Sequence, residues 1–159
     1  MPLSPIGIFH TIAGIVAVIS AIVLFARHKQ IRSGSILANT YLITTLLTAA
    51  SALTIFRHGG PNAAHVLAGL TLAAIVAGFI AERSGLLKGL TKYFVALCYS
   101  GSFLFHMLPT ATEILTRFPA DNPMVSSLTD PLLQKTFGVI TLIFLVGLVS
   151  QMVWLFKQR

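Results

Sequence analysis

The chain has 159 residues, of which 55% are apolar and only 9% charged, and its mean hydropathy is +0.87. A soluble globular protein carries about 25% charged residues, so the four carboxylates of this chain exclude a soluble enzyme, a disordered tail and a coiled coil, and indicate a membrane protein. The formal charge of +7 does not indicate a nucleic-acid partner, because the eleven Lys and Arg residues are scattered in short loops, where anionic lipid and the rules of membrane insertion explain them.

Five segments of the chain are apolar enough to cross a membrane. A spanning helix needs about 20 apolar residues to cross about 30 Å of hydrocarbon, and the five segments cover residues 6–26, 37–56, 63–81, 93–110 and 136–156. The first segment has no basic residue before it and no small-residue cleavage site, so we expect a retained span rather than a signal peptide. Asp130 followed by Pro131 predicts that the fifth helix begins a turn before its apolar part.

The stretch 111–135 is the one long loop that the pattern predicts. No helix breaker lies between Thr110 and Phe118, so we expect the fourth helix to continue past a kink at Pro109. Glu113 and Arg117 are then at i,i+4 spacing and can pair. The rest of this stretch is expected to be either an ordered cap or a flexible loop.

The positions of Lys and Arg predict the orientation of the spans. The loops after the first and third spans and the C-terminus carry eight of these residues, and the other loops carry three. Because Lys and Arg concentrate in cytoplasmic loops, this difference predicts the N-terminus outside and the C-terminus in the cytoplasm.

A short motif occurs twice. The first span opens with His10–Ile15 (HTIAGI) and the third with His65–Leu70 (HVLAGL), and the second and fourth spans each end in a His-x-x-Pro sequence that starts at His58 and His106. Two similar hairpins in the same orientation form a parallel repeat, whose halves are related by a pseudo-two-fold axis along the membrane normal. The sequence therefore predicts two repeat units, covering about residues 6–61 and 62–110, with the fifth helix (131–157) packed against them.

This repeat places four of the five histidines at one depth near the outer face. Helical phase puts His10 on a stripe of small residues, which lets membrane helices approach closely; that stripe comprises Gly7, His10, Gly14, Ala17 and Ala21. Two further stripes are polar and are expected to face the bundle interior. They comprise Tyr41, Thr44, Thr48 and Ser51 in the second span and Tyr99, Ser102, His106, Pro109 and Glu113 in the fourth.

Four histidines at one depth point to two kinds of cofactor site. Imidazole binds haem iron and transition metals through a neutral nitrogen, and haem b in a helical bundle needs two histidines on facing helices. His10, His65 and His106 can supply such a pair, with His58 as a further candidate. A zinc or copper site needs three or four converging ligands. The chain offers five candidates for such a site: His10, His58, His65, His106 and Glu113.

The same residues also support other interpretations. Histidines near a membrane interface also donate to carbonyls or headgroups, or carry protons. Glu113 suits Arg117 as an interfacial partner better than it suits a metal. The hydroxyls of the second span either bond helices to one another or line a transport path. Cys98 is the single cysteine, so no intrachain disulfide is possible. We expect Cys98 to be a small packing residue.

Signatures of hydrolases and transferases are absent from the sequence, so a catalytic role, if there is one, is expected to be membrane redox chemistry. The run from Phe105 to Pro119 (FHMLPTATEILTRFP) resembles a segment of small bacterial inner-membrane proteins of uncharacterised function, as do the His-led starts of the first and third spans. This resemblance covers the first four spans and implies a bacterial inner membrane but no activity. The bis-histidine four-helix outline is similar to cytochrome b-type bundles as a fold-level analogy.

The sequence thus predicts an all-α polytopic membrane bundle of five transmembrane helices that forms a single membrane domain. The leading functional hypothesis is a histidine-lined site near the outer face that binds haem b or a transition metal for electron transfer. The alternative is a non-redox transporter or a structural subunit of a membrane complex, in which the histidines are structural. The expected partners are the lipid bilayer and either further copies of the chain or other membrane subunits.

Overall fold

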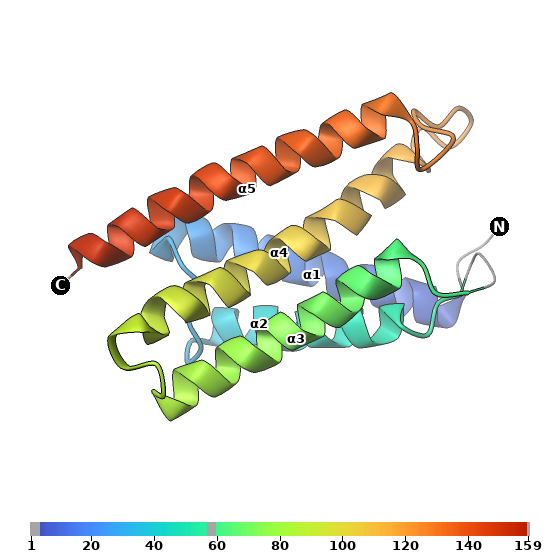
Figure 1. Ribbon diagram of the computed structural model, residues 1–159. Coiled ribbons are helices and arrows are strands. Elements are labelled where there is room, and N and C mark those ends of the chain that lie inside the picture. Colours follow the sequence, from blue (N-terminus) through green and yellow to red (C-terminus); the bar gives the residue numbers. More distant parts are fainter. Residues whose placement is uncertain (1–3, 57–59, 159) are drawn as a thin grey trace.

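The computed structural model describes residues 4–56 and 60–158, which form five α-helices and one short 3-10 helix, with no strand among them. In chain order they are α1 (Pro5–His28), α2 (Ile36–Ala52), α3 (Ala63–Ser84), η1 (Lys88–Leu90), α4 (Thr91–Leu115) and α5 (Pro131–Lys157). The helices run side by side in one bundle, with α5 along α4 at its edge (Figure 1). The all-α prediction is confirmed.

Helix starts are set by side-chain caps. Ser4 and Ser35 each accept a hydrogen bond from the third residue of the following helix, at 3.2 Å for α1 and 3.1 Å for α2. Asp130 accepts from the backbone N–H of Leu132 at 2.8 Å and is followed by a proline at the first helical position. Such caps satisfy backbone donors that have no partner inside the helix, and the start predicted for the fifth helix is confirmed.

The interior lies where α1 and α2 pack together and α3 and α4 pack together. Ala17 and Ala21 of α1 are fully buried, and Gly7 and Gly14 are buried on the same face. Small side chains on one face allow close approach between helices, and here they make room for two fully buried large residues, Tyr41 and Tyr99. The predicted small-residue stripe therefore faces the interior, with His10 half-buried on it.

Four helical segments are long and apolar enough to cross a membrane: α1, α3, η1 with α4, and α5. The remaining helix, α2, has 17 residues and ends at Ala52, four residues before the end of the predicted span. The reason is a local turn, because the backbone N–H and the hydroxyl of Thr54 both donate to the carbonyl of Ser51, at 3.0 and 2.8 Å.

The fourth helix continues through Pro109 to Leu115, as the absence of a breaker predicted. Since α5 begins at Pro131, the connection between the two helices covers 116–130, which is shorter than the predicted loop. Val125 packs this connection against the bundle. Its side chain is buried, and its backbone N–H donates to the carbonyl of Leu115 at 3.1 Å. The connection is an ordered cap.

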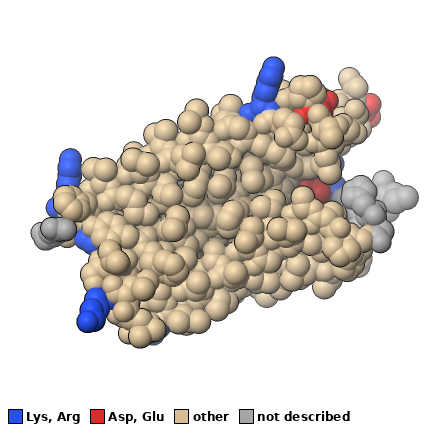
Figure 2. Space-filling view, viewed as in Figure 1, with Lys and Arg blue, Asp and Glu red and all other residues tan. Residues whose placement is uncertain are grey.

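The bundle has two ends that differ in charge. We call the end with the start of α1, the 53–62 connection and the 116–130 cap the first end, and the end with the 29–35 connection, η1 and the C-terminus of α5 the second end. Charged side chains gather toward these ends, and a broad uncharged band lies between them on the face seen in Figure 2. The large apolar side chains that α5 exposes include Leu142, Ile143, Val146 and Val149. Exposed apolar side chains of this kind are compatible with contact with lipid or with other apolar helices.

Candidate functional site

His10 is held by the helix that follows it in the chain. Its Nδ1 lies 3.1 Å from the carbonyl oxygen of Thr48 and 3.1 Å from Oγ of Ser51, both on α2. A carbonyl oxygen can only accept, so Nδ1 of His10 carries a proton, and the lone pair of the neutral ring is then on Nε2. The sequence singled out the histidine and the hydroxyl stripe of α2 as alternatives, whereas the structure joins them in one hydrogen-bonded group.

His106 of α4 faces the same group from the opposite side. A Cβ built on Gly14 would lie 3.2 Å from Nε2 of His106 and 3.6 Å from Cγ2 of Thr48. Gly14 is one helical turn after His10 on α1, so both histidines approach the same part of that helix. His10, Thr48 and His106 therefore meet where α1, α2 and α4 come together near the first end, and the absence of a side chain at Gly14 makes this approach possible. We call His10, Thr48, Ser51 and His106 the histidine cluster.

His65 has a different task. It occupies the third position of α3, where its Nδ1 accepts from the backbone N–H of Asn62 at 3.3 Å and completes a capping box with the Asn62 side chain. Its ring stacks on Phe56 with centroids 4.7 Å apart. Nε2 of His65 is buried and has no hydrogen-bond partner among the described residues. His65 thus caps the start of its own helix through Nδ1.

Two further predicted site residues are Glu113 and His58. Glu113 is exposed and forms an ion pair with Arg117, as the i,i+4 spacing predicted. His58 lies outside the described residues. Within 4–56 and 60–158, no group of three or more His, Cys, Asp or Glu side chains converges as a metal site would require.

A polar level lies deeper in the bundle. The hydroxyl of Tyr41 is 2.7 Å from Oγ of Ser102, which in turn donates to the carbonyl of Tyr99 at 2.8 Å. All three side chains are fully buried. The polar stripes predicted for the second and fourth spans therefore face each other through this contact, and Ser102 lies one turn from His106 on the same helix.

A third polar level, which the sequence analysis did not single out, surrounds Glu82 at the second end. Its carboxylate accepts from the hydroxyl of Tyr99 at 3.0 Å and from the backbone N–H of Ser33 at 3.2 Å, and Nε of Arg32 is 3.6 Å away. The Glu82 side chain is only 11% exposed. One signal could have drawn attention to it, because Glu82 is the one carboxylate of the second end and it directly follows a long apolar segment.

No protein-family model, curated protein or solved structure matches this chain. What the chain does must therefore be inferred from its own residues. Three polar groups lie in or near the interior: the histidine cluster, the contact of Tyr41 with Ser102, and the surroundings of Glu82.

Proposed function

We propose that this is a multi-pass protein of a cell inner membrane with five spanning helices, the N-terminus outside and the C-terminus in the cytoplasm. The Lys and Arg excess of the second end supports this orientation, and the burial of Tyr41, Leu42 and Thr45 supports α2 as a fifth span held by its neighbours despite its length. The test is labelling of a Lys88→Cys variant, made with Cys98→Ala, by a membrane-impermeant maleimide. Labelling occurs only after permeabilisation of the cells, and labelling of intact cells would reverse the orientation.

We further propose that the polar interior couples the protein to protons and that the protein is a proton-coupled transporter. The observation that carries this proposal is that His10, which is hydrogen-bonded to Ser51 of α2, and His106 of α4 approach the same point of an apolar bundle, at Gly14 and Thr48. Ionisable side chains within a membrane are costly and are typical of proton relays and substrate paths. Imidazole is the side chain whose unperturbed pKa lies near neutral pH, so it can both take up and release a proton there.

The deeper levels extend this group across the bundle. Ser102 is four residues from His106, about 6 Å along the helix axis, a separation that one bridging water spans. Tyr99 belongs to two levels, since its carbonyl accepts from Ser102 and its hydroxyl donates to Glu82. Glu82, in contact with Arg32 and Ser33 at the second end, is the group that would exchange protons with the solvent there.

Proton flux tests this function. Purified protein is reconstituted into vesicles that enclose a pH-sensitive dye, and a potassium diffusion potential is applied with valinomycin. The wild type acidifies the vesicles faster than protein-free vesicles do, and His106→Gln and Glu82→Gln lower the rate to the protein-free level. His28→Gln is the matched control, because His28 is an exposed histidine at the end of α1. A wild-type rate equal to that of protein-free vesicles would overturn the proposal.

A transition metal that is held by His10 and His106 and serves electron transfer is the second candidate, supported by the neighbouring imidazoles and by Met107 next to His106. Haem b between these two residues fits the structure poorly. The macrocycle would have to lie between the rings, whereas Nε2 of His106 is packed against Gly14 of α1. An absorption spectrum before and after dithionite, with elemental analysis of the same sample, separates the cases. A colourless, metal-free protein rejects both cofactors, and a stoichiometric metal that His106→Ala loses supports the second candidate.

The fifth helix offers the surface for self-association or for another membrane subunit. Only Leu133, Gln151 and Leu155 of α5 are buried, and its remaining faces are apolar and exposed. Cross-linking in native membranes tests this part of the proposal, and a monomer alone would leave α5 in contact with lipid.

A further inference from the structure

A groove of about 550 Å³ runs along the edge of the bundle between α1, α4 and α5. It exists because α5 packs against α4 and leaves a space next to the C-terminal part of α1. Its walls are large apolar side chains, among them Phe25 of α1, Phe103 and Met107 of α4, and Phe144 of α5. The groove is separate from the histidine cluster, none of whose residues line it.

The length of the groove accommodates one lipid chain. On α5 its lining extends from Ile140 to Trp154, which corresponds to about 21 Å of helix. One leaflet of a bilayer contributes about half of the 30 Å hydrocarbon thickness. The groove is thus about 6 Å longer than the hydrocarbon of one leaflet, so an acyl chain that enters from the second end lies within the groove and the headgroup is level with Gln151 and Trp154.

The groove is polar and cationic at the second end only. Gln151 lines it there and is fixed on both sides, since its Nε2 donates to the carbonyl of Lys29 at 2.7 Å and its Oε1 accepts from Ser100 at 2.8 Å. Nζ of Lys29 lies 5.9 Å from the centre of the Trp154 ring, and Nζ of Lys92 donates to the carbonyl of Leu155 at 2.6 Å. Two ammonium groups thus flank the last turns of α5.

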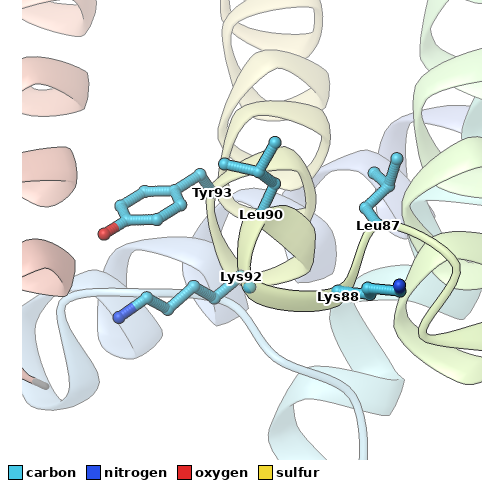
Figure 3. Close-up of a pocket in the computed structure, with 6 residues that line it drawn as sticks. Leu87, Lys88, Leu90, Lys92 and Tyr93 are labelled. Atoms are coloured by element: carbon cyan, nitrogen blue, oxygen red, sulfur yellow. The ribbon is translucent and has the colours of Figure 1, made fainter.

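Among residues 4–56 and 60–158, no Asp or Glu side chain forms an ion pair with Lys29 or Lys92. Of the four carboxylates in the chain, Glu82 is engaged by Tyr99, Ser33 and Arg32, and the other three belong to the first end. Figure 3 shows Lys92 and Tyr93 directed to one side of the connection between α3 and α4, and Leu87 and Lys88 directed to the other. Lys29 lines the groove and Lys92 reaches the neighbouring residue of α5, Leu155, whereas Lys88 is directed away.

We propose that the groove binds one anionic phospholipid, with an acyl chain between Phe103 and Phe144 and the phosphate at Lys29 and Lys92. The apolar length selects a lipid chain, and the two lysines select a negative headgroup over a zwitterionic one. Electrostatic attraction of this kind adds to the apolar burial and depends on ionic strength. The bound lipid fastens α5 to the C-terminal part of α1, which α5 otherwise meets through Gln151.

Trp154 makes the proposal directly measurable, because it is the single tryptophan of the chain and lines the groove. The protein is reconstituted into phosphatidylcholine vesicles that contain increasing fractions of dibrominated phosphatidylglycerol, which quenches tryptophan on contact. A second series uses dibrominated phosphatidylcholine in phosphatidylglycerol. The brominated anionic lipid reaches half-maximal quenching at a mole fraction about 25-fold lower than the brominated zwitterionic lipid, as expected for two lysines that each contribute about fivefold.

Variants and salt identify the cause of the preference. Lys29→Gln lowers the difference between the two lipids to the roughly fivefold preference expected from Lys92 alone, whereas Lys29→Arg, which keeps the charge, retains the full difference. Lys88→Gln is the matched control, since Lys88 also has a positive φ, is exposed and belongs to the same end. High salt removes the preference of the wild type without any substitution. Equal quenching of the wild type by both lipids, or a preference unchanged in Lys29→Gln, would overturn the proposal.

Discussion

His10 and His65 head the same sequence motif, yet they serve the bundle in different ways. His10 reaches from α1 to Thr48 and Ser51 of α2 and lies beside His106 of α4. His65 turns back to Asn62 and caps its own helix. The glycines of the two motifs also differ in how closely other helices pack against them. Gly14 is in close contact with His106, whereas nothing lies within 4 Å of a Cβ built on Gly69.

The difference arises from where each helix begins. Ser4 caps α1, so His10 is the sixth helical residue and lies beyond the first turn. Asn62 caps α3, so His65 is the third helical residue, the position from which a side chain reaches back to the cap. A shift of three residues between motif and helix start thus converts a residue of the interior into a capping residue. Similar sequences in two halves of a membrane protein therefore do not establish similar sites.

The largest expected effect separates the two glycines. Gly14→Leu forces α1 and α4 apart at His106, and overpacking of this kind costs about 1–3 kcal/mol or more of unfolding free energy. Gly69→Leu faces open space and stays within about 0.5 kcal/mol of the wild type. Unfolding of detergent-solubilised protein, followed by circular dichroism, measures both variants. An equal decrease of the unfolding free energy in Gly14→Leu and Gly69→Leu would contradict the close approach of the helices at Gly14.

A second test concerns the capping role of His65. His65→Ala removes one half of the capping box and lowers the unfolding free energy by about 1 kcal/mol. His65→Gln restores it, since glutamine at the third helical position also reaches the N-cap backbone N–H. The same unfolding assay applies. If alanine and glutamine were equally destabilising, His65 would act through its stacking on Phe56 and not through the cap.

A third test, with an expected loss of stability similar to that of His65→Ala, concerns how His10 is held. Ser51→Ala removes one of the two α2 partners of Nδ1 and leaves the Thr48 carbonyl in place, so stability falls by about 0.5–1.5 kcal/mol. Thr54→Ala, at the turn after α2, is the control for loss of a hydroxyl near the same helix end. Proton flux decreases in the first variant only. Unchanged flux in Ser51→Ala would separate the hydroxyl from the function of the histidine cluster.

Much of the fold could be predicted because it depends on local periodicity. Hydropathy located the helices, Asp130 marked the start of α5, and helical phase placed Tyr41 and Ser102 in the interior. The end of α2 was missed because the turn at Thr54 interrupts an apolar run without Gly or Pro.

The candidate site was harder to predict, since it depends on contacts between distant segments. Glu82 acquires its role from Ser33, which is 49 residues away, and from Tyr99 on the next helix. The role of His65 was missed because a capping box is recognised from Glu or Gln at the third position, and histidine there suggested a ligand.

The most direct test of the account is proton flux through vesicles that contain either His10→Gln or His65→Gln. The two variants make the same chemical change at the same position of the repeated motif, and glutamine preserves hydrogen bonding at both. The account predicts that His10→Gln lowers the flux to the level of protein-free vesicles and that His65→Gln leaves it at the wild-type level. Equal flux in the two variants would contradict the claim that only one copy of the motif contributes to the functional interior.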